Sequence, residues 1–423
     1  MRPGYKRTEA GIIPEDWEIA PLSFAIEHLE SGVSVNSVDD TFSADAGEHS
    51  ILKTSAVSRG RFLPHEAKRI TARDLSRAKL NPRAGSIIIS RMNTPELVGE
   101  CGYVADEFPQ LFVPDRLWMT VMRSSSDVCP QWLSYVLSNP PARYGIRGLA
   151  TGTSGSMKNI AKDPFLAMPV AYPSASEQRA IAAALSDVDA LLDGLDRLIA
   201  KKRDLKQAAM QQLLTGQTRL PGFHGEWEVK PLGVLGAWRG GMTPSMQNPS
   251  YWDGGDFPWI SSGDVKVSRL TDTSQHVTSW AVRHGAAVVV PTNSIVLVTR
   301  SGILRKNLPV ALVDKPMAIN QDIKALIPNE AVSGDFLLHA LTGYGDQILA
   351  RCLKAGTTVE SVEFPWLKAF IIPIPPRDEQ SVIAAVLSEM DAELSALEAR
   401  REKTRALKQG MMQELLTGRT RLV

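Results

Sequence analysis

Two copies of one helical segment limit what this chain can fold into more than any other feature. "EQRAIAAALSDVDALLDGL" at 177–195 aligns with "EQSVIAAVLSEMDAELSAL" at 379–397, and "QQLLTGQTRL" at 211–220 aligns with "QELLTGRTRL" at 413–422. The offset of 202 positions holds without a gap from Glu177 and Glu379 through Leu220 and Leu422. A repeat of this length predicts two similar halves with pseudo-twofold symmetry and excludes a solenoid of short repeats.

Within each copy, apolar residues step by three and four, which is the spacing of a coiled-coil seam. These residues are Ile181, Leu185, Val188, Leu192 and Leu195 in the first copy and Ile383, Leu387, Met390, Leu394 and Leu397 in the second. About 40 residues of helix span roughly 60 Å. We predict that the two helices pair with each other; the alternative is that each packs on its own half. Charged runs at 201–204 and 400–405 leave the continuity of the seam open.

The ends of both helices carry recognisable signals. Ser174 and Glu177 have the spacing of a capping box, and Gly216 and Gly418 stand where a left-handed helix end belongs.

The two blocks beside these helices resemble each other more weakly. "DWEIAPL" at 16–22 matches "EWEVKPL" at 226–232, "IISR" at 88–91 matches "LVTR" at 297–300, and "WLSYVL" at 132–137 matches "FLLHAL" at 336–341. Because the offset drifts here and is fixed in the helices, the helices are expected to act as spacers. The expected segments are 1–172, 173–220, 221–374 and 375–423.

Each block is expected to have an α/β (α+β) fold. "GSIIIS" and "NSIVLVTR" are short apolar runs bounded by turn residues, which favours strands, whereas "QWLSYVLS" and "DFLLHALTG" favour helices. No apolar run approaches the roughly 18 residues that a membrane helix needs, and the N-terminus has no secretory h-region. The three cysteines are far apart and have no metal spacing. We therefore expect a cytoplasmic protein with no membrane partner and no metal site.

The net charge of the whole chain is only +1, so it does not by itself indicate a nucleic-acid partner. Locally, however, residues 53–91 contain ten Lys or Arg against Glu66 and Asp74, and residues 265–306 contain six against Asp272. Such clusters suit DNA phosphates, although a charge run is often only a solvated face. The DNA-binding candidates are Lys53, Arg59, Arg61, Lys68, Arg69, Arg91, Asn93, Lys266, Arg269, Arg300, Arg305, Lys306, Asn320 and Gln321.

Arg91 and Arg300 are the strongest single candidates, since each follows an expected strand at matched positions in the two blocks. Arginine can donate two hydrogen bonds to a guanine edge, and Asn93, Asn320 or Gln321 could do so for adenine. The alternative for both arginines is an ion pair within the domain.

Two stretches are similar to catalytic motifs. "SNPPAR" at 138–143 is similar to the Asn-Pro-Pro-aromatic signature of amino-methyltransferases, but Ala142 replaces the aromatic residue, and a helix end is expected instead. "GTSGSMK" at 152–158 lacks the spacing of a P-loop. Gly152 and Thr153, with Gly356 and Thr357 in the second block, remain candidates for a backbone phosphate loop, with a plain turn as the alternative. The sequence offers no catalytic constellation.

Two variable blocks, each followed by a helix of the form "EQxxIAxxLSxxDAxL…LLTGxTRL", resemble the specificity (S) subunit of type I restriction-modification enzymes. The resemblance covers essentially the whole chain. It implies that each block is a target-recognition domain for one half of a split site in double-stranded DNA, and that the two helices pair antiparallel between them.

The resemblance also implies a subunit that is not itself an enzyme. Two methyltransferase (M) subunits and two restriction (R) subunits would be its partners. S-adenosylmethionine, ATP and Mg would be bound by those subunits and not by this chain. Two other hypotheses remain. One is a protein-binding scaffold without DNA readout, and the other is a self-contained DNA methyltransferase, which only the "NPPA" stretch supports.

Overall fold

The structure is a computed structural model that describes residues 4–8, 11–38, 48–152, 157–354 and 359–422. It divides into two compact units, the first formed by residues 1–194 with 400–423 and the second by residues 195–399. Each unit therefore combines one block with the first part of the helix that follows it and the last part of the other long helix. In the described residues, no helix has the length and apolar character required to cross a membrane.

The first unit is built on a six-stranded sheet with the strand order β4-β14-β10-β12-β8-β7 and a four-stranded sheet with the order β13-β6-β9-β5. Three strand pairs, β1-β2, β11-β15 and β16-β3, complete it. The strands are β1 Tyr5–Thr8, β2 Gly11–Pro14, β3 Glu18–Pro21, β4 Ile26–Glu30, β5 Ser37–Val38, β6 Ser50–Leu52, β7 Val57–Ser58, β8 Gly60–Phe62, β9 Ala67–Ile70, β10 Ile87–Ser90, β11 Met92–Asn93, β12 Cys101–Tyr103, β13 Leu111–Phe112, β14 Leu117–Met122, β15 Lys158–Asn159 and β16 Pro169–Tyr172. Its short helices are α1 Pro130–Ser138, α2 Pro140–Gly148 and α3 Lys162–Leu166.

The second unit repeats this plan with a five-stranded sheet of order β18-β26-β23-β24-β20, a four-stranded sheet of order β21-β19-β25-β22 and the pair β17-β27. Its strands are β17 Glu228–Pro231, β18 Gly236–Gly240, β19 Phe257–Ile260, β20 Arg269–Leu270, β21 Gln275–Val277, β22 Val288–Val290, β23 Ile295–Val298, β24 Val310–Val313, β25 Met317–Ile319, β26 Ile323–Pro328 and β27 Ile371–Ile374. Its short helices are α5 Ser279–Arg283, α6 Gly334–Gly343, α7 Gly345–Cys352 and α8 Phe364–Ala369.

Five strands of the larger sheets correspond in the two units, and β7 is an additional edge strand in the first. In both, the central strand (β10 or β23) pairs antiparallel with both of its neighbours. One of these neighbours, β12 or β24, pairs parallel with the next strand, β8 or β20. The strands expected from "GSIIIS" and "NSIVLVTR" and the helices expected from "QWLSYVLS" and "DFLLHALTG" are confirmed as β10, β23, α1 and α6. Both blocks thus have the α+β fold that the sequence predicts.

Both faces of the central strands are buried, which explains why their sequences are uninterrupted apolar runs. In β10, Ile87 and Ile89 belong to one core cluster and Ile88 to another. In β23, Ile295 and Leu297 share one cluster, and Val296 and Val298 share a second. Each strand therefore joins the helical layer to the smaller sheet of its unit.

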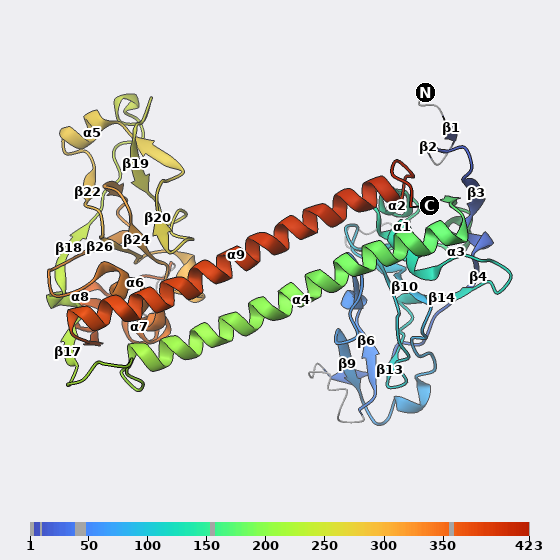
Figure 1. Cartoon of the computed structure of the whole chain (residues 1–423), viewed down its shortest axis with the longest axis horizontal. Helices are drawn as coiled ribbons and strands as arrows, with labels where there is room; N and C mark the ends of the chain where they lie inside the picture. Colours follow the sequence, from blue (N-terminus) through green and yellow to red (C-terminus); the bar gives the residue numbers. More distant parts are fainter. Residues whose placement is uncertain (1–3, 9–10, 39–47, 153–156, 355–358, 423) are drawn as a thin grey trace. The chain divides into compact units, whose positions relative to one another are not determined.

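The two long helices are α4 Ala175–Leu214 and α9 Arg377–Leu415. Both are continuous through the charged runs, so these runs do not break the helices. In the first unit, the C-terminal end of α9 lies beside α1, α2 and the start of α4 (Figure 1). Gly216 and Gly418 have φ of 73° and 68°, which confirms the left-handed helix ends.

The second unit contains a buried histidine on α6. His339 on α6 is 3% exposed, and its Nε2 lies 2.9 Å from the Ser388 hydroxyl oxygen on α9. Burial lowers its pKa to about 4, and Lys206 and Arg269 act in the same direction against Asp391 and Asp335. The imidazole is therefore neutral at neutral pH.

We predict that the second unit loses stability as the pH falls from about 6.5 towards 4. In this window His339 is protonated in the unfolded chain, where its pKa is the ordinary 6.5, but stays neutral in the folded chain. The loss should reach roughly 2–3 kcal/mol. Urea unfolding at several pH values measures it, with His339→Gln as the control that cannot titrate. Parallel pH profiles for the two proteins would contradict this account.

Candidate nucleic-acid interface

The two leading arginines occupy the same place in the two units, at the end of the central strand. Arg91 lies between β10 and β11, where its backbone N–H donates to the Arg116 carbonyl at 3.2 Å. Arg300 follows β23 and forms an isolated bridge with Ser361. Within the described residues no carboxylate forms an ion pair with either side chain, so the ion-pair alternative finds no support there. The Arg91 guanidinium lies 6.0 Å from the centre of the Trp118 ring.

The amide candidates differ in how accessible they are. Asn93 donates through Nδ2 to the Ser90 hydroxyl at 3.1 Å. Asn320 is only 6% exposed, and its Oδ1 accepts from the backbone N–H of Asp322, so it shapes its own loop. Gln321 is exposed and donates to the Asp322 carboxylate.

Several basic candidates are held by acidic neighbours within their own unit. The pairs are Arg61 with Asp193, Arg69 with Glu48, Arg269 with Asp314 and Asp335, and Arg305 with Glu360. Arg59, Lys266 and Lys306 are exposed, whereas Lys53 and Lys68 are half-buried. The basic runs are therefore partly a network of local ion pairs, and only some of their charges face solvent unopposed.

The expected phosphate loops can be placed only in part. Gly152 has φ of 141°, and its carbonyl accepts from the Lys158 ammonium at 2.8 Å. Thr153, Gly356 and Thr357 lie outside the described residues.

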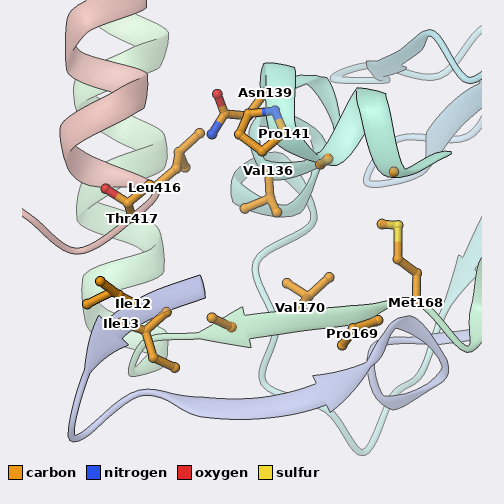
Figure 2. A pocket seen from close by; sticks show the side chains of 13 residues that line it. Ile12, Ile13, Val136, Asn139, Pro141, Met168, Pro169, Val170, Leu416 and Thr417 are labelled. Atoms are coloured by element: carbon orange, nitrogen blue, oxygen red, sulfur yellow. The ribbon is translucent and has the colours of Figure 1, made fainter. Parts of the chain in front are cut away.

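The "SNPPAR" stretch forms a helix boundary, as expected. Asn139 ends α1 and begins α2. A pocket of about 380 Å³ lies beside it, lined mostly by apolar side chains such as Ile12, Ile13, Val170 and Leu416 (Figure 2). None of the lining residues is charged. A pocket of the second unit, about 480 Å³ in volume, lies along α4 and is lined by charged and polar groups including Arg203, Lys206 and Asp346.

In each unit, a buried glutamate at the start of one long helix binds an arginine just after the end of the other long helix. Glu177 on α4 is 1% exposed and accepts from Nε and Nη2 of Arg421 at 2.6 and 2.9 Å. The indole N–H of Trp17 also donates to it at 3.3 Å. Arg421 binds Asp16 as well, at 2.9 and 2.7 Å. We call the trio Trp17, Glu177 and Arg421 the first clasp.

The second unit repeats the arrangement with different neighbours. Glu379 on α9 is fully buried and accepts from Nε and Nη2 of Arg219 at 2.6 and 2.7 Å. The indole N–H of Trp227 donates to it at 3.1 Å. We call Trp227, Glu379 and Arg219 the second clasp. The two clasps explain why the sequence repeats "EQ" at each helix start, "TRL" after each helix end and "W" at the start of each block.

The glutamine that follows each clasp glutamate binds the block of the same unit. Gln178 accepts from the backbone N–H of Cys129 at 2.9 Å, and Gln380 accepts from that of Ser333 at 2.8 Å. Both glutamines are buried, and both donate to a proline carbonyl just before their helix. The helix starts are thus fixed both to the other helix and to the sheet domain.

Charged pairs between the helices define the same antiparallel register in both units. In the first unit Lys408 donates to Asp189 at 2.7 Å, and in the second Lys206 pairs with Asp391. The numbers 189 and 408 add to 597, as do 206 and 391. Lys202 with Glu393 and Arg203 with Glu398 fill the stretch of α4 where the apolar seam lapses. In that stretch the contacts between the helices include ion pairs where the leucines of the seam are missing.

The predicted seam residues are not all alike. Ile181 and Leu185 are buried in the core of the first unit with Leu415 and Leu416. Ile383 and Leu387 are buried in that of the second with Leu213 and Leu214. The remaining seam residues are buried at Leu192 and Leu195 and half-buried at Val188, Met390, Leu394 and Leu397.

Sequence reasoning missed the clasps and also a cluster of arginines on α2. Glu177 was expected to cap its own helix; Ser174 does cap the N–H of Glu177 at 3.3 Å, but the carboxylate binds Arg421. Arg143 and Arg147, which surround Glu100, had only their spacing of four residues as a signal.

Comparison with known proteins agrees with this architecture. Residues 224–406 match the family described as type I restriction modification DNA specificity domain. The chain is 35% identical over 207 residues to the specificity subunit of the type I restriction enzyme EcoR124I/EcoR124II of Escherichia coli, a match that covers 49% of this chain and 51% of that protein. A 20% identical match to the type I restriction enzyme MjaVIII specificity subunit of Methanocaldococcus jannaschii covers 97% of this chain and 94% of that one.

Among solved structures, the crystal structure of the type I restriction-modification S subunit from M. genitalium superimposes with a TM-score of 0.61 at 15% identity. It covers 98% of this chain and 99% of that one. At this identity the likeness establishes the fold alone.

We predict that Glu379→Gln destabilises the second unit by about 2–3 kcal/mol, because it leaves the half-buried Arg219 guanidinium without a counter-charge. Glu398→Gln, which removes an exposed partner from the same helix, should cost less than about 1 kcal/mol. Urea unfolding of both variants makes the comparison. Equal losses would show that the second clasp adds nothing beyond a surface ion pair.

Proposed function

The chain belongs to the specificity subunits of type I restriction-modification enzymes, and on that premise we propose that it reads a bipartite, asymmetric site in double-stranded DNA. Each unit reads one half-site. The chain itself carries out no chemistry. It holds two methyltransferase subunits, which bind S-adenosylmethionine, and two restriction subunits, which use ATP and Mg.

The observation that carries this proposal is a five-strand order shared by the larger sheets of two units whose sequences differ, joined to helix segments that keep one register. Equal scaffolds with unequal loops suit two readers of two different sequences. Arg91 and Arg300, at the ends of the equivalent strands β10 and β23, are the side chains that we assign to base contacts. Arg59, Lys266 and Lys306 are exposed and suit phosphates.

The long helices set the distance between the half-sites in this proposal. Major grooves on one face of DNA recur about every 34–36 Å, and a helix pair of roughly 60 Å can hold two readers at that separation. The shared register of the charged pairs in the two units supports a fixed spacing.

We predict that exchanging residues 228–374 for the equivalent block of a relative changes one half-site and leaves the other and the gap intact. This boundary keeps Arg219, Trp227 and Glu379 of the second clasp in place. Methylome sequencing of a host with the chimera and its methyltransferase partner reads the result, and the reciprocal exchange of residues 18–172 is the matched control. A change in both half-sites from either exchange would refute the division of labour.

A second prediction concerns the spacer. Inserting four residues between Gly194 and Leu195 and four between Ala399 and Arg400 should lengthen the preferred gap by one or two base pairs, because the helices grow by roughly 6 Å and a base pair adds about 3.4 Å. These positions leave the charged pairs and clasps within each unit untouched. The half-site sequences should stay the same. An unchanged gap in an active variant would mean that something other than helix length sets the spacing.

A further inference from the structure

Two arginine side chains and the backbone N–H of a third arginine meet one buried carboxylate in the first unit. Glu100, directly before β12, is 2% exposed. Its Oε1 accepts from Nη2 of Arg143 and lies 3.6 Å from Nη2 of Arg147, both on α2. Its Oε2 accepts from the backbone N–H of Arg59 at 2.6 Å. None of these residues belongs to the clasps or to the strand end at Arg91.

The charges of this cluster do not balance. Apart from Glu100, no acidic side chain among the described residues forms an ion pair with Arg59, Arg143 or Arg147. Burial lowers the pKa of Arg143, and the charges of Arg147 and Arg59 lower it further, so the three cations act on one another. A second anion beside them would relieve this repulsion.

The guanidinium groups are within reach of a ligand. The side chains of Arg143 and Arg147 are 26% and 34% exposed, and Tyr144 between them on α2 is 83% exposed. Arg59 is exposed and is held in a left-handed conformation with φ of 52°. The Nε atoms of Arg143 and Arg147 are buried and have no hydrogen-bond partner in the described part of the chain, so a ligand would meet the exposed remainder of each guanidinium.

The second unit provides an internal comparison. The clasps recur there because the scaffold needs them, but the arginine cluster does not recur. The α2 positions 143 and 147 correspond to Gln347 and Arg351 on α7, at the offset of 204 that relates α1 to α6. The Arg351 guanidinium packs 5.8 Å from the centre of the Phe370 ring. A purely structural cluster of this fold would be expected in both units.

We propose that Arg59, Arg143 and Arg147 form a binding site for a DNA backbone phosphate that anchors the first unit on DNA independently of base sequence. Arginine forks fit the paired oxygens of a phosphodiester, and such contacts fix register and orientation without reading bases. This inference rests on the proposed function, because it takes the ligand to be DNA.

The test is the salt dependence of binding by the full chain to a random-sequence duplex. Loss of one phosphate contact should lower the slope of log affinity against log salt by about 0.9. We expect this loss for Arg143→Gln, whereas Arg143→Lys, which keeps the charge, should retain most of the slope. Glu100→Gln should bind the duplex more tightly than the unchanged chain. Arg351→Gln, the matched variant of the second unit, should leave the slope as it is.

Three results would overturn the proposal. The first is an unchanged slope in folded Arg143→Gln. The second is weaker binding by both Arg143→Gln and Glu100→Gln, which would assign the cluster to structure. The third has two parts: inorganic phosphate stabilises the unchanged chain, but not Arg143→Gln, against thermal unfolding, and the two proteins have the same salt slope on DNA. That result would mean that the cluster binds free phosphate instead of DNA. Failure of the unchanged chain to prefer its own target would count against the proposed function, whereas the slopes on random DNA judge the site.

Discussion

A buried carboxylate needs a partner, and each of the two most buried glutamates among the described residues finds its partner far away in the sequence. Glu177 binds Arg421, and Glu379 binds Arg219. An uncompensated charge at such a depth would cost several kcal/mol, so each helix start is stable only when the end of the other helix is present. Folding of either unit therefore requires both long helices. This dependence makes one chain with two blocks behave as two closed units.

The same contacts fix how the helices slide against each other. A seam of leucines alone tolerates shifts of register, because one leucine can replace another in the same hole. The clasp pairs Glu177 with Arg421 and Glu379 with Arg219 have no equivalent one heptad away, so they select a single alignment. The charged pairs Lys206 with Asp391 and Lys408 with Asp189 agree with that alignment. The clasp numbers 177 with 421 and 219 with 379 both add to 598, within one residue of the value for the charged pairs. For a protein proposed to read two half-sites at a set distance, one defined register matters more than high helix stability.

Local sequence signals predicted the elements but not their long-range contacts. The strands β10 and β23 and the helices α1, α6, α4 and α9 could be predicted because periodicity and end signals act over a few residues. The clasps could not, since Arg421 lies 244 positions from Glu177 and either residue alone reads as a surface charge. The charged run at 201–204 was read as a gap in the seam, whereas Lys202 and Arg203 bind acids of α9 there.

Side-chain roles in the candidate interface were still harder to predict. Arg61 was counted as a DNA-binding candidate in the basic run at 53–91, but its side chain binds Asp193 of α4. The sequence could not show this, because a solvent-facing charge and an ion pair look identical in it. The cluster on Glu100 was overlooked for the opposite reason: only the fold brings α2 against the residues before β12. Which bases Arg91 and Arg300 contact depends on loop geometry against DNA, so their role stays a prediction.

In the proposed arrangement, two separate readers are held at one spacing by helices of fixed register. Methylome sequencing of a host that carries the unchanged chain with its methyltransferase partner tests it most directly. We expect one modified motif made of two different short half-sites separated by a non-specific gap of a single length. A contiguous motif, or half-sites that occur with several gap lengths, would contradict it.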